Sequence, residues 1–329
     1  MTDSLPIPDS PAGATQTPAD AAAPAGTPTT PVATPGRLLG AADIRRIADE
    51  AGVSPTKKFG QNFVIDPGTV RRIVHEAGVD ADSRVLEVGP GLGSLTLAIL
   101  ETGATVTAVE IDPPLAERLP ATVAEFMPAA AGRLTVTNRD ALTVGPATLP
   151  QFADGRPFTL VANLPYNVAT PIVLTLLERF ANLGSFLVMV QKEVADRLAA
   201  TPGTKVYGTP SVKLAWYGRA ERAGLIGRNV FWPAPNVDSA LVRFVRTDAA
   251  ADGTPRDASL REETFRLIDA AFGQRRKTLH AALRKLVPAG AFEAAGIDPT
   301  RRGETLTADE FAHLAAACRA LAGQIEEAR

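Results

Sequence analysis

The sequence has very little cysteine and no long apolar run, and both absences narrow the class of protein. Cys318 is the only cysteine among 329 residues, so no disulfide can form within the chain. We expect a buried structural thiol and a reducing, cytoplasmic location. No apolar stretch reaches the ~20 residues that a transmembrane helix requires, which argues against a membrane protein.

Histidine is also scarce, and the chain as a whole lacks an excess of positive charge. The three histidines, His75, His280 and His313, are far apart and show no metal-ligand spacing, so we expect no metal site. The formal net charge of the whole chain is −2, which by itself argues against nucleic-acid binding. This sum does not show how charge is distributed along the chain. Residues 271–302 contain seven basic and two acidic residues, a local excess that suits contact with phosphates.

The first 36 residues contain no lysine or arginine and are rich in alanine, proline and threonine. Because a signal peptide needs a basic segment followed by an apolar one, we expect none, and we predict a disordered tail over residues 1–36. The composition of residues 248–258 predicts a linker. It separates a predicted domain over residues 37–247 from a small helical domain over residues 259–329.

Short apolar segments alternate with helical ones, which predicts an α/β fold with a Rossmann-like, mainly parallel sheet. A helix over residues 41–51 is predicted to precede this sheet. Two later segments, residues 211–217 and 240–245, are predicted to form an antiparallel pair of strands at one edge. The buried strands are predicted over residues 84–88, 105–109, 134–137, 158–162 and 185–190.

A glycine-rich turn follows the first predicted strand. Residues 89–94 (GPGLGS) connect that strand to a helical stretch, which is how a nucleotide-binding βαβ unit begins. The spacing is G-x-G-x-G, whereas dinucleotide-binding turns carry G-x-G-x-x-G around a pyrophosphate. Gly89 and Gly91 permit close approach of a ligand, and the turn contains no basic residue. These features favour a ligand without phosphates, such as S-adenosylmethionine.

Polar side chains follow three further predicted strands. Glu110, Asp140 and Asn163 each come just after an apolar segment ends. Because open α/β sheets bind ligands at the carboxyl ends of their strands, we expect these residues to share one site with the glycine turn. Glu110 is placed to accept hydrogen bonds from both hydroxyls of a ribose, and Asp140 to accept one from an adenine amino group.

The segment Asn163-Leu164-Pro165-Tyr166 is suited to hold one flat base. The Asn163 side chain and the Leu164 carbonyl can both accept hydrogen bonds from an exocyclic amino group, and Pro165 fixes the backbone between them. Tyr166 offers a ring that can stack on a base taken out of its helix. The same residue types are also common in ordinary turns, so the segment gains its meaning from the strand ends upstream.

Together these motifs resemble the ribosomal RNA adenine dimethyltransferase family, in particular its small-subunit (16S) enzymes, the kasugamycin-sensitivity methylases. Residues 59–64 (FGQNFV) resemble the family's GQNFL motif, with Val64 in place of leucine. Residues 231–240 (FWPAPNVDSA) resemble its F-x-P-x-P-x-V-D-S segment, and residues 275–279 (RRKTL) its basic C-terminal motif. The resemblance covers about residues 40–320 and rests on six ordered motifs.

The resemblance implies an S-adenosylmethionine-dependent enzyme that dimethylates two adjacent adenosines near the 3′ end of 16S rRNA, without a metal. It implies a cofactor site formed by Asn62, Val64, Gly89, Gly91, Glu110, Asp140 and Asn163, with Glu87, Gly91 and Leu92 at its methionine end. It implies an adenine site formed by Asn163, Leu164, Pro165 and Tyr166, with Phe231 on the other face of the base. It also implies rRNA contacts through Arg275, Arg276 and Lys277. We expect a monomer, because the basic surface must stay open to the small ribosomal subunit.

Other functions remain open at this point. A large-subunit methylase of the macrolide-resistance type shares the fold and residues 163–167, although residues 231–240 and 275–279 favour the small-subunit enzyme. A mainly non-catalytic assembly factor that binds the immature small subunit is another alternative, although the intact cofactor residues argue against a purely binding role. A DNA adenine methylase is less well supported, because those enzymes usually carry Asp-Pro-Pro-Tyr. A Rossmann oxidoreductase is the weakest alternative, because it would need its third glycine one residue later.

Overall fold

The computed structural model describes residues 36–53 and 62–327. The predicted tail over residues 1–36 therefore lies outside the described residues except for Gly36. The same holds for residues 59–61 of the FGQNFV motif. None of the described helices is both long enough and apolar enough to cross a membrane.

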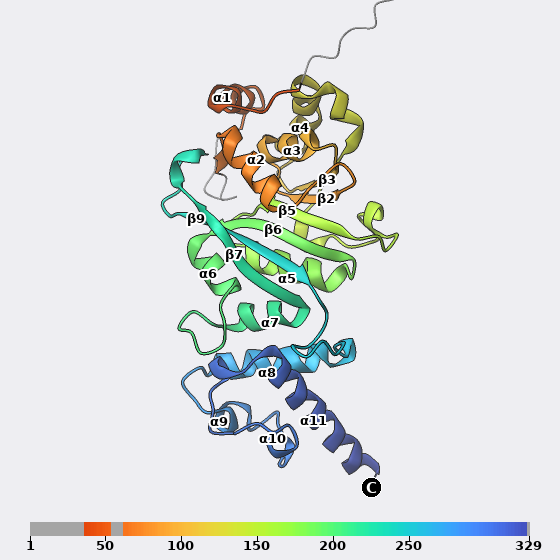
Figure 1. The fold of residues 1–329 in the computed structure, drawn as a ribbon, viewed down its shortest axis with the longest axis vertical. Coiled ribbons are helices and arrows are strands. Elements are labelled where there is room, and N and C mark those ends of the chain that lie inside the picture. The colour runs from red at the N-terminus through yellow and green to blue at the C-terminus, as the bar shows by residue number, and fades with distance from the viewer. Residues whose placement is uncertain (1–35, 54–61, 328–329) are drawn as a thin grey trace, which may run out of the picture. The chain divides into compact units, whose positions relative to one another are not determined.

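A seven-stranded, mostly parallel sheet confirms the predicted α/β class. Its strands are β2 (Arg84–Val88), β3 (Thr105–Glu110), β4 (Leu134–Asn138), β5 (Phe158–Asn163), β6 (Leu183–Gln191), β7 (Gly218–Ile226) and β9 (Ser239–Arg246). They lie in the order β4-β3-β2-β5-β6-β9-β7 (Figure 1). The first five are parallel, and β9 is antiparallel to both β6 and β7. The chain order reverses at β2, and ligands of such sheets bind at this reversal point.

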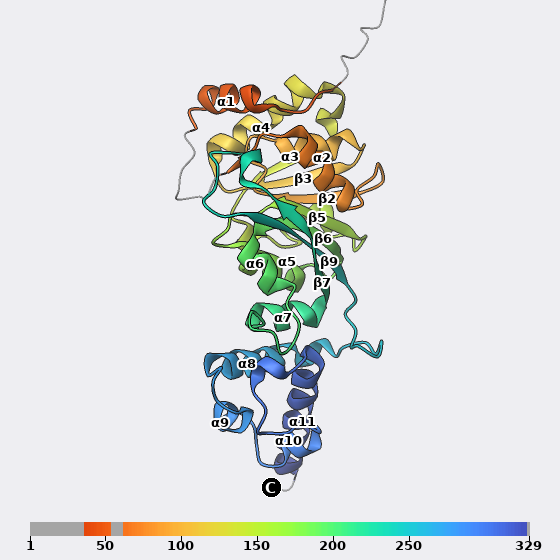
Figure 2. The ribbon, with the colours of Figure 1, turned by 60° about the vertical axis from the view of Figure 1, so that its left-hand side comes forward.

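Helices cover both faces of the sheet (Figure 2). Alternation along the central strand β5 shows why: Val161 packs into the core on one face, whereas Leu160 and Ala162 pack into the core on the other. A strand buried on both faces favours apolar side chains on both, which explains the apolar run over residues 160–162. The first face carries α2 (Pro67–Glu76), α3 (Ser94–Glu101) and α4 (Pro113–Phe126), and the second carries α5 (Ala169–Arg179), α6 (Lys192–Leu198) and α7 (Thr209–Tyr217).

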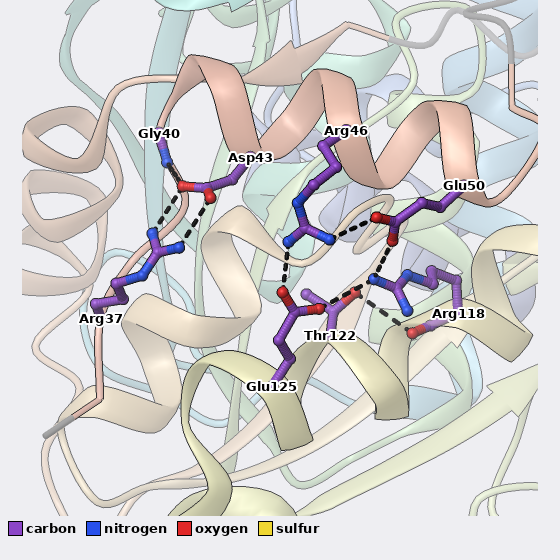
Figure 3. Close-up of polar contacts among 8 residues, drawn as sticks. All are labelled: Arg37, Gly40, Asp43, Arg46, Glu50, Arg118, Thr122 and Glu125. Atoms are coloured by element: carbon purple, nitrogen blue, oxygen red, sulfur yellow. Dashed lines mark hydrogen bonds and ion pairs between the residues drawn. The ribbon is translucent and has the colours of Figure 1, made fainter. Parts of the chain in front are cut away.

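An N-terminal helix, α1 (Ala41–Glu50), confirms the predicted helix and lies beside α4. Its Ile44 and Ile47 are fully buried in the core of the first face. At the rim, Arg118 of α4 pairs with Glu50 at 3.0 Å and with Glu125 at 3.2 Å, and Arg46 pairs with both acids (Figure 3). Because these charges are partly exposed, the isoleucines contribute most of the stabilisation, and the ion pairs add little.

The structure corrects one of the two predicted edge strands. Residues 211–217 form most of helix α7, whereas residues 240–245 lie in β9 as predicted. Alternate apolar residues at Val212, Leu214 and Trp216 mimic a strand, but Pro210 and Ser211 start a helix: the Ser211 hydroxyl accepts from the Gly208 amide at 3.1 Å. The antiparallel partner of β9 at the edge is β7, which sequence inspection missed because its charged residues are typical of exposed edge strands.

The C-terminal part is helical and has its own group of buried apolar residues. Its helices are α8 (Arg261–Gly273), α9 (Leu279–Leu283), α10 (Ala291–Ala294) and α11 (Ala308–Glu327). Tyr207, which precedes α7, and Val212, which lies within α7, are buried in the same group as Ile268 and Phe311. The described residues form one compact unit, so the division into domains at residues 247 and 259 stays a prediction.

Arg256 fastens the predicted linker to the helices on either side of it. Its guanidinium pairs with Asp309 of α11 and donates to the carbonyls of Ala215 and Trp216 in α7. The Arg256 side chain is 9% exposed and that of Asp309 is 19% exposed. The segment is therefore structured at this point, and Arg256 holds α11 against α7.

We predict that Arg256→Ala lowers the free energy of unfolding by about 3 kcal/mol, because it removes the counter-charge of the half-buried Asp309 carboxylate, which keeps only the Ala251 amide as a donor, and leaves two backbone carbonyls without theirs. Urea unfolding followed by circular dichroism measures the change. The matched control is Arg197→Ala, which removes an exposed ion pair with Glu193 and should cost less than about 1 kcal/mol. Equal losses in the two variants would contradict this assignment.

Candidate active site

A cavity of about 270 Å³ lies at the carboxyl ends of the parallel strands. The strands end side by side because their pairing is in register: Val88 lies opposite Val109, and Glu110 lies opposite Asn138. The cavity is lined by residues from every predicted cofactor position and from the predicted base-binding segment. The predicted residues among them are Asn62, Val64, Glu87, Gly89, Gly91, Leu92, Glu110, Asp140, Asn163, Leu164, Pro165 and Tyr166.

The glycine turn needs glycine for two separate reasons. Gly89, Gly91 and Gly93 have φ angles of +69°, +56° and +97°, which side chains rarely adopt. A Cβ atom on Gly91 would also lie 2.9 Å from the ring of Phe63. Only glycine at these positions therefore allows the backbone of the turn to form part of the cavity wall.

Glu110 fixes the glycine turn to the end of the next strand. Its two carboxylate oxygens accept hydrogen bonds from the Gly91 amide at 3.1 Å and the Asp112 amide at 3.0 Å. The side chain is buried, and this burial raises its pKa above the ordinary glutamate value. Because each carboxylate oxygen can accept two hydrogen bonds, both oxygens keep capacity for the hydroxyls of a ribose.

Asp140 and Asn163 each have one polar atom engaged within the protein. Asp140 Oδ1 accepts from the Leu142 amide at 2.9 Å and so caps the short turn that follows β4. Asn163 Nδ2 donates to the carbonyl of Asn62 at 3.1 Å. With its amide nitrogen used in this way, Asn163 offers its side-chain oxygen as the acceptor, which is the role that the sequence predicts.

Tyr166 is held by a residue far away in the sequence. Its hydroxyl shares a hydrogen bond of 2.7 Å with Ser239, which is fully buried at the start of β9. Burial raises the pKa of the Tyr166 hydroxyl above its ordinary value, so the phenol stays protonated at neutral pH. Ser239 lies inside the motif over residues 231–240, but only the structure shows that it orients Tyr166.

Glu87 is a buried acid in the wall of the cavity. Its side chain is 1% exposed, and Oε2 accepts from the hydroxyl of Thr96 at 2.6 Å. Burial, assisted by the nearby charge of Glu110, raises the pKa of Glu87 to about 8. Glu87 lines the cavity, and its role at the methionine end of the cofactor stays a prediction. The rise in its pKa has no signal in the sequence.

Phe231 lies close to the site without lining the cavity. It forms strand β8 (Phe231–Trp232), which pairs with β1 (Phe63–Val64) so that Phe231 is opposite Val64. Its ring is 3% exposed and packs into the core of the first face. The prediction that Phe231 stacks on the target adenine stays a prediction.

The basic motif does not line the cavity, and its basic residues differ in their contacts. Arg275 pairs with Glu304 at 2.7 Å and donates to the Lys205 carbonyl at 2.9 Å. The side chains of Arg276 and Lys277 make no hydrogen bond or ion pair with the part of the chain that the structure describes. Two of the three predicted RNA-binding side chains are therefore available to phosphates, while Arg275 joins two segments of the protein.

No group of three or more histidine, cysteine or acidic side chains in residues 36–53 and 62–327 is arranged to hold a metal ion. The charged side chains that line the cavity are Glu87, Glu110, Arg139 and Asp140. Three acids and one exposed arginine give the cavity an acidic character, which suits a ligand that carries positive charge.

Two relatives agree with the resemblance seen in the sequence. The protein named ribosomal RNA small subunit methyltransferase A from Bifidobacterium longum strain DJO10A is 78% identical over 288 residues, covering 86% of this chain and 94% of that protein. The protein of the same name from Leifsonia xyli subsp. xyli is 59% identical over 285 residues, covering 85% of this chain and 98% of that protein.

Solved structures share the fold. The 23S rRNA methyltransferase ErmE matches with a TM-score of 0.58 at 26% identity, covering 78% of this chain and 100% of that one. A dimethyladenosine transferase from Plasmodium falciparum matches with a TM-score of 0.63 at 23% identity, covering 77% of this chain and 95% of that one. The family model described as ribosomal RNA adenine dimethylase matches residues 53–319. This chain belongs to the ribosomal RNA adenine dimethylase family.

Proposed function

We propose that this protein transfers methyl groups from S-adenosylmethionine to the N6 amino groups of two adjacent adenosines near the 3′ end of 16S rRNA. One observation carries the proposal: a single cavity joins the glycine turn, Glu110 and Asp140 to the base-binding segment at Asn163. A cofactor site and a base site that share one wall are what methyl transfer requires. The names of the 78% and 59% identical relatives support the small subunit as the substrate.

The residues present fit S-adenosylmethionine. Gly91 leaves open the space beside Phe63 that a Cβ atom would fill, and Glu110 retains acceptor capacity for a ribose. Asp140 Oδ2 has no hydrogen bond to the described residues and suits the adenine amino group. When bound, S-adenosylmethionine supplies an electrophilic methyl group on a sulfonium sulfur.

The chain's contribution to the chemistry is to position and polarise the target adenine. The amino nitrogen of adenine is a weak nucleophile because its lone pair is delocalised into the ring. Acceptors at the Asn163 side chain and the Leu164 carbonyl favour a localised lone pair and stabilise positive charge that develops on the nitrogen. Tyr166, held by Ser239, fixes the plane of the ring, so much of the rate enhancement comes from orientation.

A strong general base is not required by this scheme. The amino nitrogen becomes strongly acidic once it is methylated, so its proton can leave to solvent after transfer. The phenol of Tyr166 stays protonated and is engaged with Ser239, so its role is orientation.

The basic segment after α8 supplies the contact with rRNA in this proposal. Arg276 and Lys277 would contact phosphates, whereas Arg275 would position them through its bonds to Glu304 and Lys205. We place the reaction in the cytoplasm, where small ribosomal subunits are assembled, and we expect the protein to act as a monomer.

The direct test is methylation of unmethylated small ribosomal subunits by the purified protein with S-adenosylmethionine, followed by mass spectrometry of the digested rRNA. We expect N6,N6-dimethyladenosine at two adjacent positions near the 3′ end of 16S rRNA. Methylated adenosine in 23S rRNA instead would favour the macrolide-resistance activity. A lack of product in both RNAs would favour a non-catalytic assembly factor.

We predict that Glu110→Ala weakens S-adenosylmethionine binding by about 100-fold and abolishes methylation at limiting cofactor, because it removes the acceptors for the ribose and loosens the glycine turn. Binding to small subunits, measured by co-sedimentation, should be unchanged. The control is Glu101→Ala, which removes an exposed carboxylate that pairs with Arg71 at the far end of α3. Loss of subunit binding in Glu110→Ala would contradict the separation of the two sites.

We also predict that the double variant Arg276→Ala/Lys277→Ala makes binding less dependent on salt. The negative slope of log affinity against log salt concentration should become shallower by about 2, because two phosphate contacts are lost. Filter binding to small subunits at several salt concentrations measures the slope. Arg275→Ala should lower the melting temperature instead, because Glu304 and the Lys205 carbonyl lose their donor. The control is Arg156→Ala, which removes an exposed arginine just before β5. An unchanged slope in the double variant would refute the assignment.

A further inference from the structure

The segment between α6 and α7 is exposed and carries a lysine without a partner. We call residues 201–206 (TPGTKV) the α6–α7 loop; all six are exposed, and the large apolar side chain of Val206 is 46% exposed. The Lys205 ammonium makes no hydrogen bond or ion pair within residues 36–53 and 62–327. A free cation beside an exposed apolar side chain suits RNA, which offers phosphates together with the apolar surfaces of its sugars and unstacked bases.

Three hydrogen bonds join this loop to the basic motif and to the turn before α11. The Gly203 amide donates to the carbonyl of Glu304 at 2.8 Å, and Arg275 donates to the carbonyl of Lys205 at 2.9 Å. Arg275 also donates to the carboxylate of Glu304 at 2.7 Å. Figure 1 shows the loop beside the end of α8 that leads into the basic motif. Arg275 and Glu304 therefore hold together three segments that are far apart in the sequence.

Tyr207 anchors the end of the loop in the buried core of the C-terminal part. Its ring is 2% exposed and makes a T-shaped contact with the ring of Phe272, with the two centroids 6.0 Å apart. Its hydroxyl donates to the Leu306 carbonyl at 2.8 Å. Because burial of this large aromatic side chain favours one position of the loop, Lys205, two residues earlier, stays beside the basic motif.

The loop and the basic motif together present three free cations. The side chains of Lys205, Arg276 and Lys277 are exposed and make no ion pair with the part of the chain that the structure describes. Glu304, the acid bonded to this group, pairs with Arg275 and so does not neutralise them. Like charges held close together repel one another, and phosphates relieve this repulsion. The positive surface thus extends over two segments of the chain.

We propose that the α6–α7 loop is a second element that contacts rRNA: Lys205 binds a phosphate next to those bound by the basic motif, and Val206 packs against a sugar of the same strand. The inference rests on the proposed function, because it takes rRNA as the ligand of the basic motif. The loop leads into α7, which packs on the sheet that carries the base-binding segment. One RNA strand bound to both elements is therefore anchored to the C-terminal helices and to the sheet at once.

Filter binding of Lys205→Ala to small ribosomal subunits at several salt concentrations tests the phosphate contact. The negative slope of log affinity against log salt concentration should become shallower by about 1, because one contact is lost. Alanine keeps the backbone carbonyl that Arg275 binds, so the loop stays in place. KM for subunits should rise while kcat is unchanged, because Lys205 does not line the cavity. The control, Arg156→Ala, removes one exposed positive charge elsewhere and should leave the slope unchanged.

Hydroxyl-radical cleavage from iron-EDTA tethered to single cysteines locates the loop on the RNA. Lys205→Cys, Lys277→Cys and Arg156→Cys are each labelled and bound to small subunits, and cleavage of the rRNA is mapped by primer extension. Lys205→Cys and Lys277→Cys should cleave overlapping stretches of 16S rRNA, and Arg156→Cys should not cleave them. The native Cys318 is buried, and the labelled wild type measures the cleavage that arises from it.

Val206→Ser separates the apolar contact from the ionic one. It removes an apolar surface and no charge, so it should weaken binding about threefold without changing the slope.

An unchanged slope for Lys205→Ala would overturn this inference and leave the proposed function intact. So would a lack of 16S rRNA cleavage from Lys205→Cys in a protein that still methylates subunits. Weaker binding of Lys205→Ala with an unchanged slope and no cleavage would assign the loop to a ribosomal protein instead of RNA, which also overturns the inference. Failure of the wild type to methylate rRNA or to bind subunits would overturn the proposed function, and this inference with it.

Discussion

The parallel, in-register pairing of β2 with β3, and of β3 with β4, is the constraint on which the site depends. It brings the ends of these strands to one edge, so that the glycine turn, Glu110 and Asp140 border a single cavity. The parallel strand β5 adds Asn163 from the other side of β2. Burial on both faces makes most of β5 apolar, and its polar Asn163 comes where the strand ends.

Burial also sets the electrostatics of the cavity. Glu87 and Glu110 are acids in a poorly hydrated wall, and both have pKa values raised by burial. Such acids are costly for stability, because ionised carboxylates lose their hydration when they are buried. A positively charged ligand offsets this cost, whereas a dinucleotide with its phosphates would increase it. The acidic wall and the absence of a basic residue in the glycine turn thus favour the same class of ligand.

Features that depend on adjacent residues could be predicted from the sequence, whereas contacts between residues far apart in the chain could not. Strand ends and the glycine turn were predictable because an apolar run and the polar residue after it are adjacent in sequence. Helix α7 was mistaken for a strand because alternate apolar residues hid its helical start at Pro210. The bond between Tyr166 and Ser239 joins residues 73 positions apart, and no local pattern reports such a contact. The burial of Glu87 likewise follows only from the assembled fold.

A crystal structure of the protein with S-adenosylmethionine would test most directly whether one nucleoside site lies at the four strand ends. We predict that both ribose hydroxyls lie ~2.7–3.0 Å from the Glu110 carboxylate, that the adenine amino group lies at Asp140, and that the sulfonium methyl faces Asn163. A cofactor bound elsewhere, or bound in the cavity without contact to Glu110, would contradict it.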